Sequence, residues 1–135
     1  MRLALAGALS LLVLGCDAQR EDRLKQGVAR LGRAEEQLRS APNAAKVDLL
    51  AELARTPCLE PAACSARDAC TSGYTLHVDA LSLTRVAKQN MADGQDEQAA
   101  KLLGAALEKL SLAQSRIDEC TALMAALRRA HGTDR

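Results

Sequence analysis

Residues 97–130 carry a small or apolar side chain at alternating spacings of three and four residues through about four heptads. This pattern is typical of a helix that packs along its whole length against a partner helix. Further leucines on the flanks of the stripe indicate that the helix faces more than one neighbour. The stripe consists of Ala99, Leu103, Ala106, Leu110, Ala113, Ile117, Cys120, Met124, Leu127 and His131, and the flanking leucines are Leu102, Leu107, Leu112 and Leu123.

The preceding segment, residues 66–91, has a wide apolar sector of its own. Ser65 and Asp68 have the spacing of a capping box, which places the start of this helix at Ser65. Asp93-Gly94 separates the two segments, and glycine tolerates the left-handed conformation that ends a helix. The two segments are therefore expected to form a long antiparallel helical hairpin.

Two shorter segments also have helical periodicity. Residues 19–40 carry one apolar stripe in which Glu35 is the polar exception, and residues 44–55 follow Asn43, a candidate N-cap. Residues 56–64 contain two prolines and are expected to form a loop. The chain has one Tyr and no Phe or Trp, so its core must consist of Leu and Ala, which favour helices. We therefore predict an all-α fold, a small three- to four-helix bundle built on the hairpin.

Five cysteines are present, and four of them lie beyond residue 50. Cys70 and Cys120 are almost equally distant in sequence from the turn at Gly94, so they should face each other within the Cα–Cα limit of about 7 Å for a disulfide. This register favours a bundle stapled by Cys70–Cys120 and Cys58–Cys64. The alternatives are Cys64–Cys120 with Cys58–Cys70, or free thiols.

The N-terminus has the pattern of an export signal. Met1-Arg2 is followed by an apolar run from Leu3 to Leu14, which is too short to span a bilayer, and by Gly15-Cys16. With Val13-Leu14-Gly15-Cys16 at its end, the segment resembles a bacterial lipoprotein precursor. The resemblance implies that residues 1–15 are a signal peptide, that Cys16 carries the lipid, and that acyl chains such as palmitate anchor the protein in a membrane.

Residues 16–135 then form one α-helical domain. The resemblance places this domain in the bacterial cell envelope, on the periplasmic face of the inner or outer membrane, where four further cysteines fit two disulfides. Without Arg2, seventeen Lys and Arg balance seventeen Asp and Glu. This balance argues against a nucleic-acid partner and against electrostatic attachment to a membrane surface.

His77 and His131 are the two histidines. His77 lies in a mostly apolar sector and is expected to be a core residue hydrogen-bonded to a neighbour, whereas His131 ends the last helix, where a cation interacts well with the helix dipole. The sequence lacks zinc-ligand spacing, a nucleophile elbow and a phosphate-binding loop, so we expect no enzyme, no cofactor and no metal. The residues indicate a structural or protein-interaction module that binds an unidentified envelope protein; the alternative is a metal- or ligand-responsive periplasmic sensor built around His77.

Overall fold

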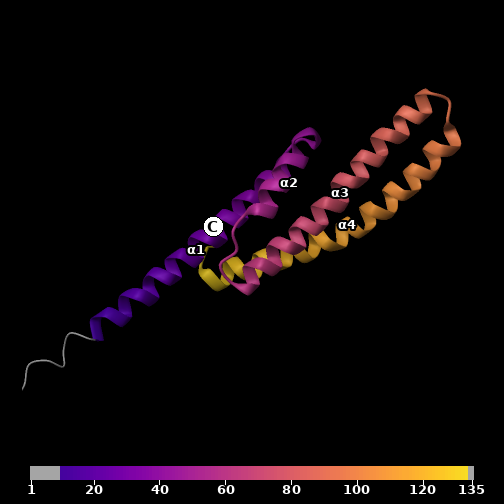
Figure 1. Cartoon of the computed structure of the whole chain (residues 1–135). Helices are drawn as coiled ribbons and strands as arrows, with labels where there is room; N and C mark the ends of the chain where they lie inside the picture. The colour runs from indigo at the N-terminus through magenta and orange to yellow at the C-terminus, as the bar shows by residue number, and fades with distance from the viewer. Residues whose placement is uncertain (1–9, 134–135) are drawn as a thin grey trace, which may run out of the picture.

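The computed structural model describes residues 10–133, with the side chains of residues 10–16 left out. Its helices are α1 (Ser10–Ser40), a 3-10 turn η1 (Asn43–Ala45), α2 (Lys46–Arg55), α3 (Pro61–Ala92) and α4 (Asp96–His131), as Figure 1 shows. The predicted all-α class is confirmed. None of the helices in the described part of the chain combines the length and apolar character needed to cross a membrane.

Helices α3 and α4 form the predicted antiparallel hairpin, which Gly94 closes with a φ of 74°. A small residue recurs at every seventh position along the contact, so the two backbones approach closely. A Cβ atom added at Gly73 would lie 3.0 Å from the backbone nitrogen of Ile117. The small buried residues are Ala66, Gly73, Ala80 and Ala87 of α3 and Ala99, Ala106, Ala113 and Cys120 of α4.

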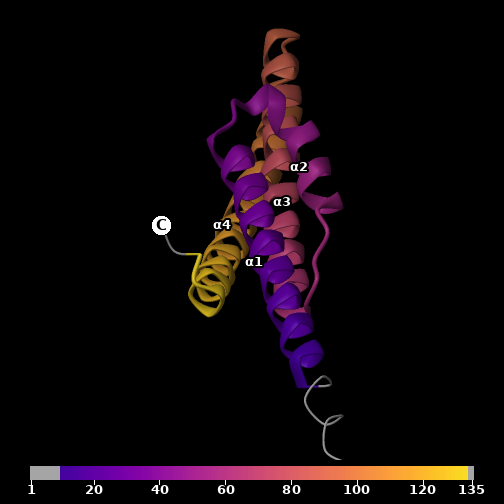
Figure 2. The ribbon, with the colours of Figure 1, turned by 90° about the vertical axis from the view of Figure 1, so that its left-hand side faces the viewer.

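Helices α1 and α2 lie over the open half of the hairpin, where α3 begins and α4 ends, while the closed end extends beyond them (Figures 1 and 2). The core sits in this covered half, where Leu31 and Leu38 of α1 and Leu53 of α2 pack with residues of the hairpin. The Lys46 ammonium group at the start of α2 donates hydrogen bonds to the carbonyl oxygens of Leu38 (2.9 Å) and Arg39 (3.2 Å). A cation thus satisfies carbonyl groups at the end of α1.

The predicted start of α3 at Ser65 is wrong, because the helix begins at Pro61. Proline suits the first helical position because its missing N–H would be unpaired there in any case. Ser65 lies exposed inside the helix, and Asp68 pairs with Arg67 instead of capping the backbone. The loop is correspondingly shorter than the predicted residues 56–64.

Two other boundaries also differ from the prediction. Helix α1 already includes Ser10, the first described residue, and does not begin at residue 19, so it runs without a break past Cys16. Asn43 makes no N-cap for a helix at residue 44; it opens a 3-10 turn after Pro42, and α2 starts at Lys46 without a side-chain cap. Residues 1–9 of the expected signal peptide and the Cys16 side chain lie outside the description.

Candidate functional site

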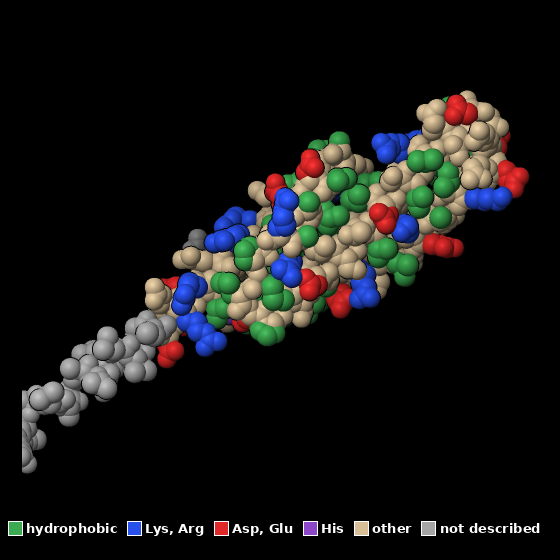
Figure 3. Space-filling view, viewed as in Figure 1, with side chains coloured by type: hydrophobic (Ala, Val, Ile, Leu, Met, Phe, Trp, Pro, Cys, Tyr) green, Lys and Arg blue, Asp and Glu red, His purple; other side chains and the backbone are tan. Residues whose placement is uncertain are grey.

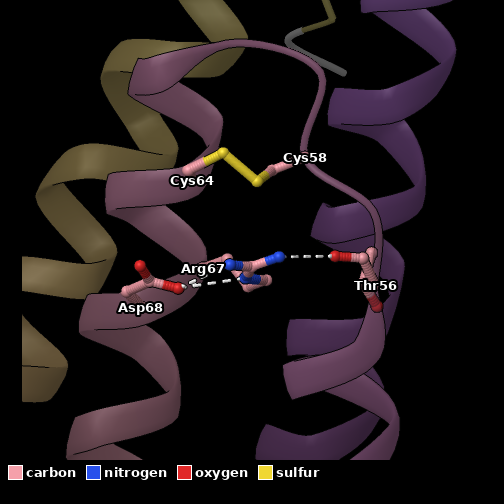
Figure 4. The surroundings of a disulfide bond; sticks show 5 residues. All are labelled: Thr56, Cys58, Cys64, Arg67 and Asp68. Atoms are coloured by element: carbon pink, nitrogen blue, oxygen red, sulfur yellow. Dashed lines mark hydrogen bonds and ion pairs between the residues drawn. A yellow bond between two sulfur atoms is a disulfide. The ribbon is translucent and has the colours of Figure 1, made fainter.

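The structure contains the disulfide pairing that the hairpin register favours. Cys70 and Cys120 are fully buried between α3 and α4, with their Cα atoms 4.7 Å apart. Cys58 and Cys64, with Cα atoms 5.0 Å apart, tie the short loop to the first turn of α3 and are partly exposed (Figure 4). The alternative pairing and free thiols are thereby ruled out for this structure.

Arg67 adds a second tie between the loop and α3. Its guanidinium group donates one hydrogen bond to the Thr56 carbonyl oxygen (3.3 Å) and two to one Asp68 carboxylate oxygen (3.0 and 2.9 Å), as Figure 4 shows. Thr56 is buried, and its hydroxyl group donates to the carbonyl oxygen of Glu52. The surroundings of Cys58–Cys64 therefore hold α2 against α3.

A buried carboxylate lies at the centre of the bundle. The Tyr74 hydroxyl group donates a hydrogen bond to Glu35 (3.0 Å), and the Arg39 guanidinium group lies 3.7 Å from the same oxygen. Burial, together with the charge of Glu35, raises the pKa of Tyr74. Glu35 interrupts the apolar stripe of α1 because the single tyrosine of the chain faces it, a contact that spans 39 residues.

His131 lies in the last turn of α4, as predicted, whereas His77 lacks its expected neighbour. His77 is partly buried, but its ring makes no hydrogen bond within the described residues, so the expected bonded neighbour is wrong. Burial and the positive charge of Lys46 lower the pKa of His77. His131 pairs with Glu60, which lies 71 residues earlier and links the end of α4 to the start of α3. No local pattern could have shown that partner.

Metal binding has no obvious ligand set in the part of the chain that the structure describes. No group of three or more His, Cys, Asp or Glu side chains there could hold a metal ion. The Lys46 ammonium group, which acts electrostatically on His77, would also repel a cation. A sensor built around His77 would therefore need to bind a ligand other than a metal cation.

We expect His77→Gln to cost at most about 2 kcal/mol, because the ring forms no hydrogen bond that the variant would break. Since the folded pKa lies below the ordinary 6.5, the stabilising contribution of His77 is complete above pH about 6.5 and is lost as the pH falls through the folded pKa. The variant should therefore lose less stability than the parent between pH about 7.5 and 5.5 in urea titrations. A metal site found by titration and lost in His77→Ala would instead support the sensor.

A groove of about 650 Å³ lies where α3 emerges from beneath η1 and α2. Figure 3 shows it as a notch between the start of α2 and the hairpin. Val47 forms one wall, and Val78 and Leu81 of α3 form the other, with Arg85 and Lys88 further along α3. Neither of these two cations forms an ion pair among the described residues. The groove thus combines apolar walls with free positive charge.

The closed half of the hairpin also exposes leucines of α4. Leu103 and Leu110, which the heptad pattern places in the seam, are each 37% exposed, and Leu107 beside them is 68% exposed. Their spacing of four and three residues puts them on one stripe of the helix. The flanking leucines predicted that α4 faces a second neighbour. Among the described residues, however, Leu107 stays exposed.

Comparison with other proteins adds no identity. No family model, no curated protein and no solved structure matches the chain.

Proposed function

We propose that the chain is a non-catalytic bacterial envelope lipoprotein, anchored in a membrane through acylated Cys16, that binds another envelope protein at the groove between α2 and α3. The observation that carries the binding role is the apolar wall of Val47, Val78 and Leu81. Val47 is 59% exposed although it lies beside other apolar side chains. Contiguous apolar surface of this kind on a soluble domain marks an interaction site.

The groove has the character of a surface that receives a protein segment. Its walls come from two helices, so an incoming helix or strand can place apolar side chains between them. Asp79, which also lines the groove, is paired with Lys109 across the hairpin (2.9 Å), which leaves Arg85 and Lys88 as the free charges. A partner segment that carries both apolar side chains and carboxylates can pack against the walls and pair with these two cations.

Helix α1 supports the anchoring role. It runs from Ser10 to Ser40 without interruption, so the backbone at Cys16 is already helical. The bundle therefore follows the proposed lipid site directly, with no flexible linker between them. A domain attached in this way stays close to the membrane, and its orientation depends on the direction of α1.

We expect Cys16→Ser to abolish membrane anchoring, because several acyl chains, each gaining about 0.8 kcal/mol per buried methylene, supply the attachment. The variant should either appear in the soluble envelope fraction or accumulate as an unprocessed precursor. Flotation in a density gradient, with mass spectrometry of the N-terminus, distinguishes these results. A Cys16→Ser protein that has lost residues 1–15 and still floats with membranes contradicts the lipid anchor.

We expect a photo-crosslinking side chain at Val47 to capture one discrete partner in intact cells. The matched control is Leu112 of α4, which is likewise 59% exposed but does not line the groove. The Val47 product should weaken when Lys88 is replaced by Glu, since that charge lies at the groove. Equal labelling from both positions, or a product insensitive to Lys88→Glu, would show that the groove is not the binding surface.

A further inference from the structure

The neutral charge balance of the chain hides a strong separation of charge in space. Residues 17–33 and 128–131 together carry seven Lys or Arg and three Asp or Glu, a net charge of +4 with His131 neutral. Residues 34–127 carry nine Lys or Arg and thirteen Asp or Glu, a net charge of −4; one of these acids, Glu60, lies at the end of α4, where it pairs with His131. Acidic side chains are frequent at the closed end of the hairpin, as Figure 3 shows.

The two basic segments lie at the same end of the molecule. The end of α4 lies beside the middle of α1 in both Figure 1 and Figure 2. A Cβ atom added at Gly32 of α1 would lie 3.5 Å from the Arg128 guanidinium group.

The arginines of this end are free to bind another anion. Arg20, Arg23, Arg30, Arg33 and Arg129 are exposed, and none of them forms an ion pair within the described residues, nor does the half-buried Arg128. The acidic residues at this end are Asp17, Asp22, Glu21 and Glu60; Glu21 already pairs with Lys25 (2.9 Å), and Glu60 pairs with His131. We call this set of six arginines the basic end.

The basic end is also the end that carries Cys16. At a rise of about 1.5 Å per residue, Arg20 and Arg23 lie roughly 6 and 10 Å along α1 from Cys16. The Debye length is about 8 Å at physiological ionic strength, so Arg20 lies within it and Arg23 lies just beyond it. The field of an anionic surface at Cys16 therefore reaches both side chains.

We propose that the basic end rests on anionic lipid headgroups of the membrane that holds Cys16, so that the groove and the acidic hairpin tip point away from it. This inference rests on the proposed lipid anchor. Guanidinium groups bind phosphate oxygens with two parallel hydrogen bonds, which suits the phosphodiester of an anionic lipid. The acidic remainder of the molecule is repelled by the same surface, and both effects favour one orientation.

The test measures the accessibility of individual arginines in the reconstituted, acylated full-length protein. We place it in vesicles of phosphatidylcholine alone or with phosphatidylglycerol, treat both with phenylglyoxal and quantify each modified arginine by mass spectrometry. We expect modification of Arg20 and Arg23 to be about fivefold slower in the anionic vesicles, and the protection to disappear in about 0.5 M salt. Arg85, at the groove, is the internal control and should react equally in both.

Charge reversal provides the matched variants. Arg20→Glu/Arg23→Glu should abolish the lipid-dependent protection of Arg129, whereas Arg85→Glu/Lys88→Glu, with the same change in net charge, should leave it intact. Equal modification of Arg20 and Arg23 in both vesicles overturns the inference while leaving the anchor in place, provided that the protein floats with the vesicles. Slower modification of Arg85 to the same extent would also overturn it. Failure of the protein to float rejects the proposed anchor itself.

Discussion

Replacing Cys70 and Cys120 together by alanine lowers the melting temperature by more than about ten degrees. The two sulfur atoms are fully buried and close a loop of 50 residues, for which the chain-entropy model gives about 4 kcal/mol. In a domain of this size, each kcal/mol corresponds to a shift of several degrees. The core has no Phe or Trp to compensate, so this bond supplies a large share of the total stability.

The control is the double replacement of Cys58 and Cys64, whose bond spans a sequence separation of 6 residues. The same model gives about 2 kcal/mol for so short a loop. Thermal unfolding followed by circular dichroism, with equal protein concentrations, measures both variants. If the loss of Cys58–Cys64 costs as much as the loss of Cys70–Cys120, the hairpin disulfide is not the main covalent support of the bundle.

Gly73→Ala destabilises the protein by about 1–3 kcal/mol, even though alanine is the better helix former. Its Cβ atom would lie 2.9 Å from the Cγ1 atom of Ile117, 3.0 Å from the Ile117 nitrogen and 3.1 Å from the Arg116 carbonyl carbon. Two of these three atoms belong to the backbone and cannot rotate away. Helices α3 and α4 would have to separate one turn from the Cys70–Cys120 bond, which holds them together.

Gly104→Ala is the matched control for this substitution. Gly104 is an exposed glycine of α4, and a Cβ atom added there meets nothing within 4 Å. It should therefore stabilise the helix by about 0.5–1 kcal/mol. Urea unfolding midpoints should move in opposite directions for the two variants. A neutral or stabilising effect of Gly73→Ala would show that the helices are not as closely packed as the structure indicates.

Local patterns in the sequence predicted the hairpin and its disulfide correctly. The heptad spacing of α4 depends on residues within one helix, and the left-handed turn at Gly94 depends on one glycine. These two features set a register that favoured Cys70–Cys120 over the alternative pairings, and the structure contains that bond. The predicted start of α3 was wrong because the Ser65 and Asp68 spacing competes with Pro61, which begins a helix more effectively.

The candidate site could not be predicted in the same way. Val47 and Leu81 come from different helices, and neither stands out in its own segment. Arg85 and Lys88 resemble ordinary surface charges until the structure shows that they line the groove and that neither forms an ion pair among the described residues. The lipid site at Cys16 remains a prediction from the N-terminal pattern, since its side chain lies outside the description.

Helical class, hairpin register and cysteine pairing follow from the order of residues along the chain, because each depends on periodicities of a few residues or on distance from one turn. The Tyr74–Glu35 hydrogen bond and the Glu60–His131 pair join residues 39 and 71 positions apart. The groove and the separation of charge likewise arise only when distant segments are brought together. These features depend on how the helices pack, because a side chain is buried, paired or exposed according to its neighbours in space and not in sequence.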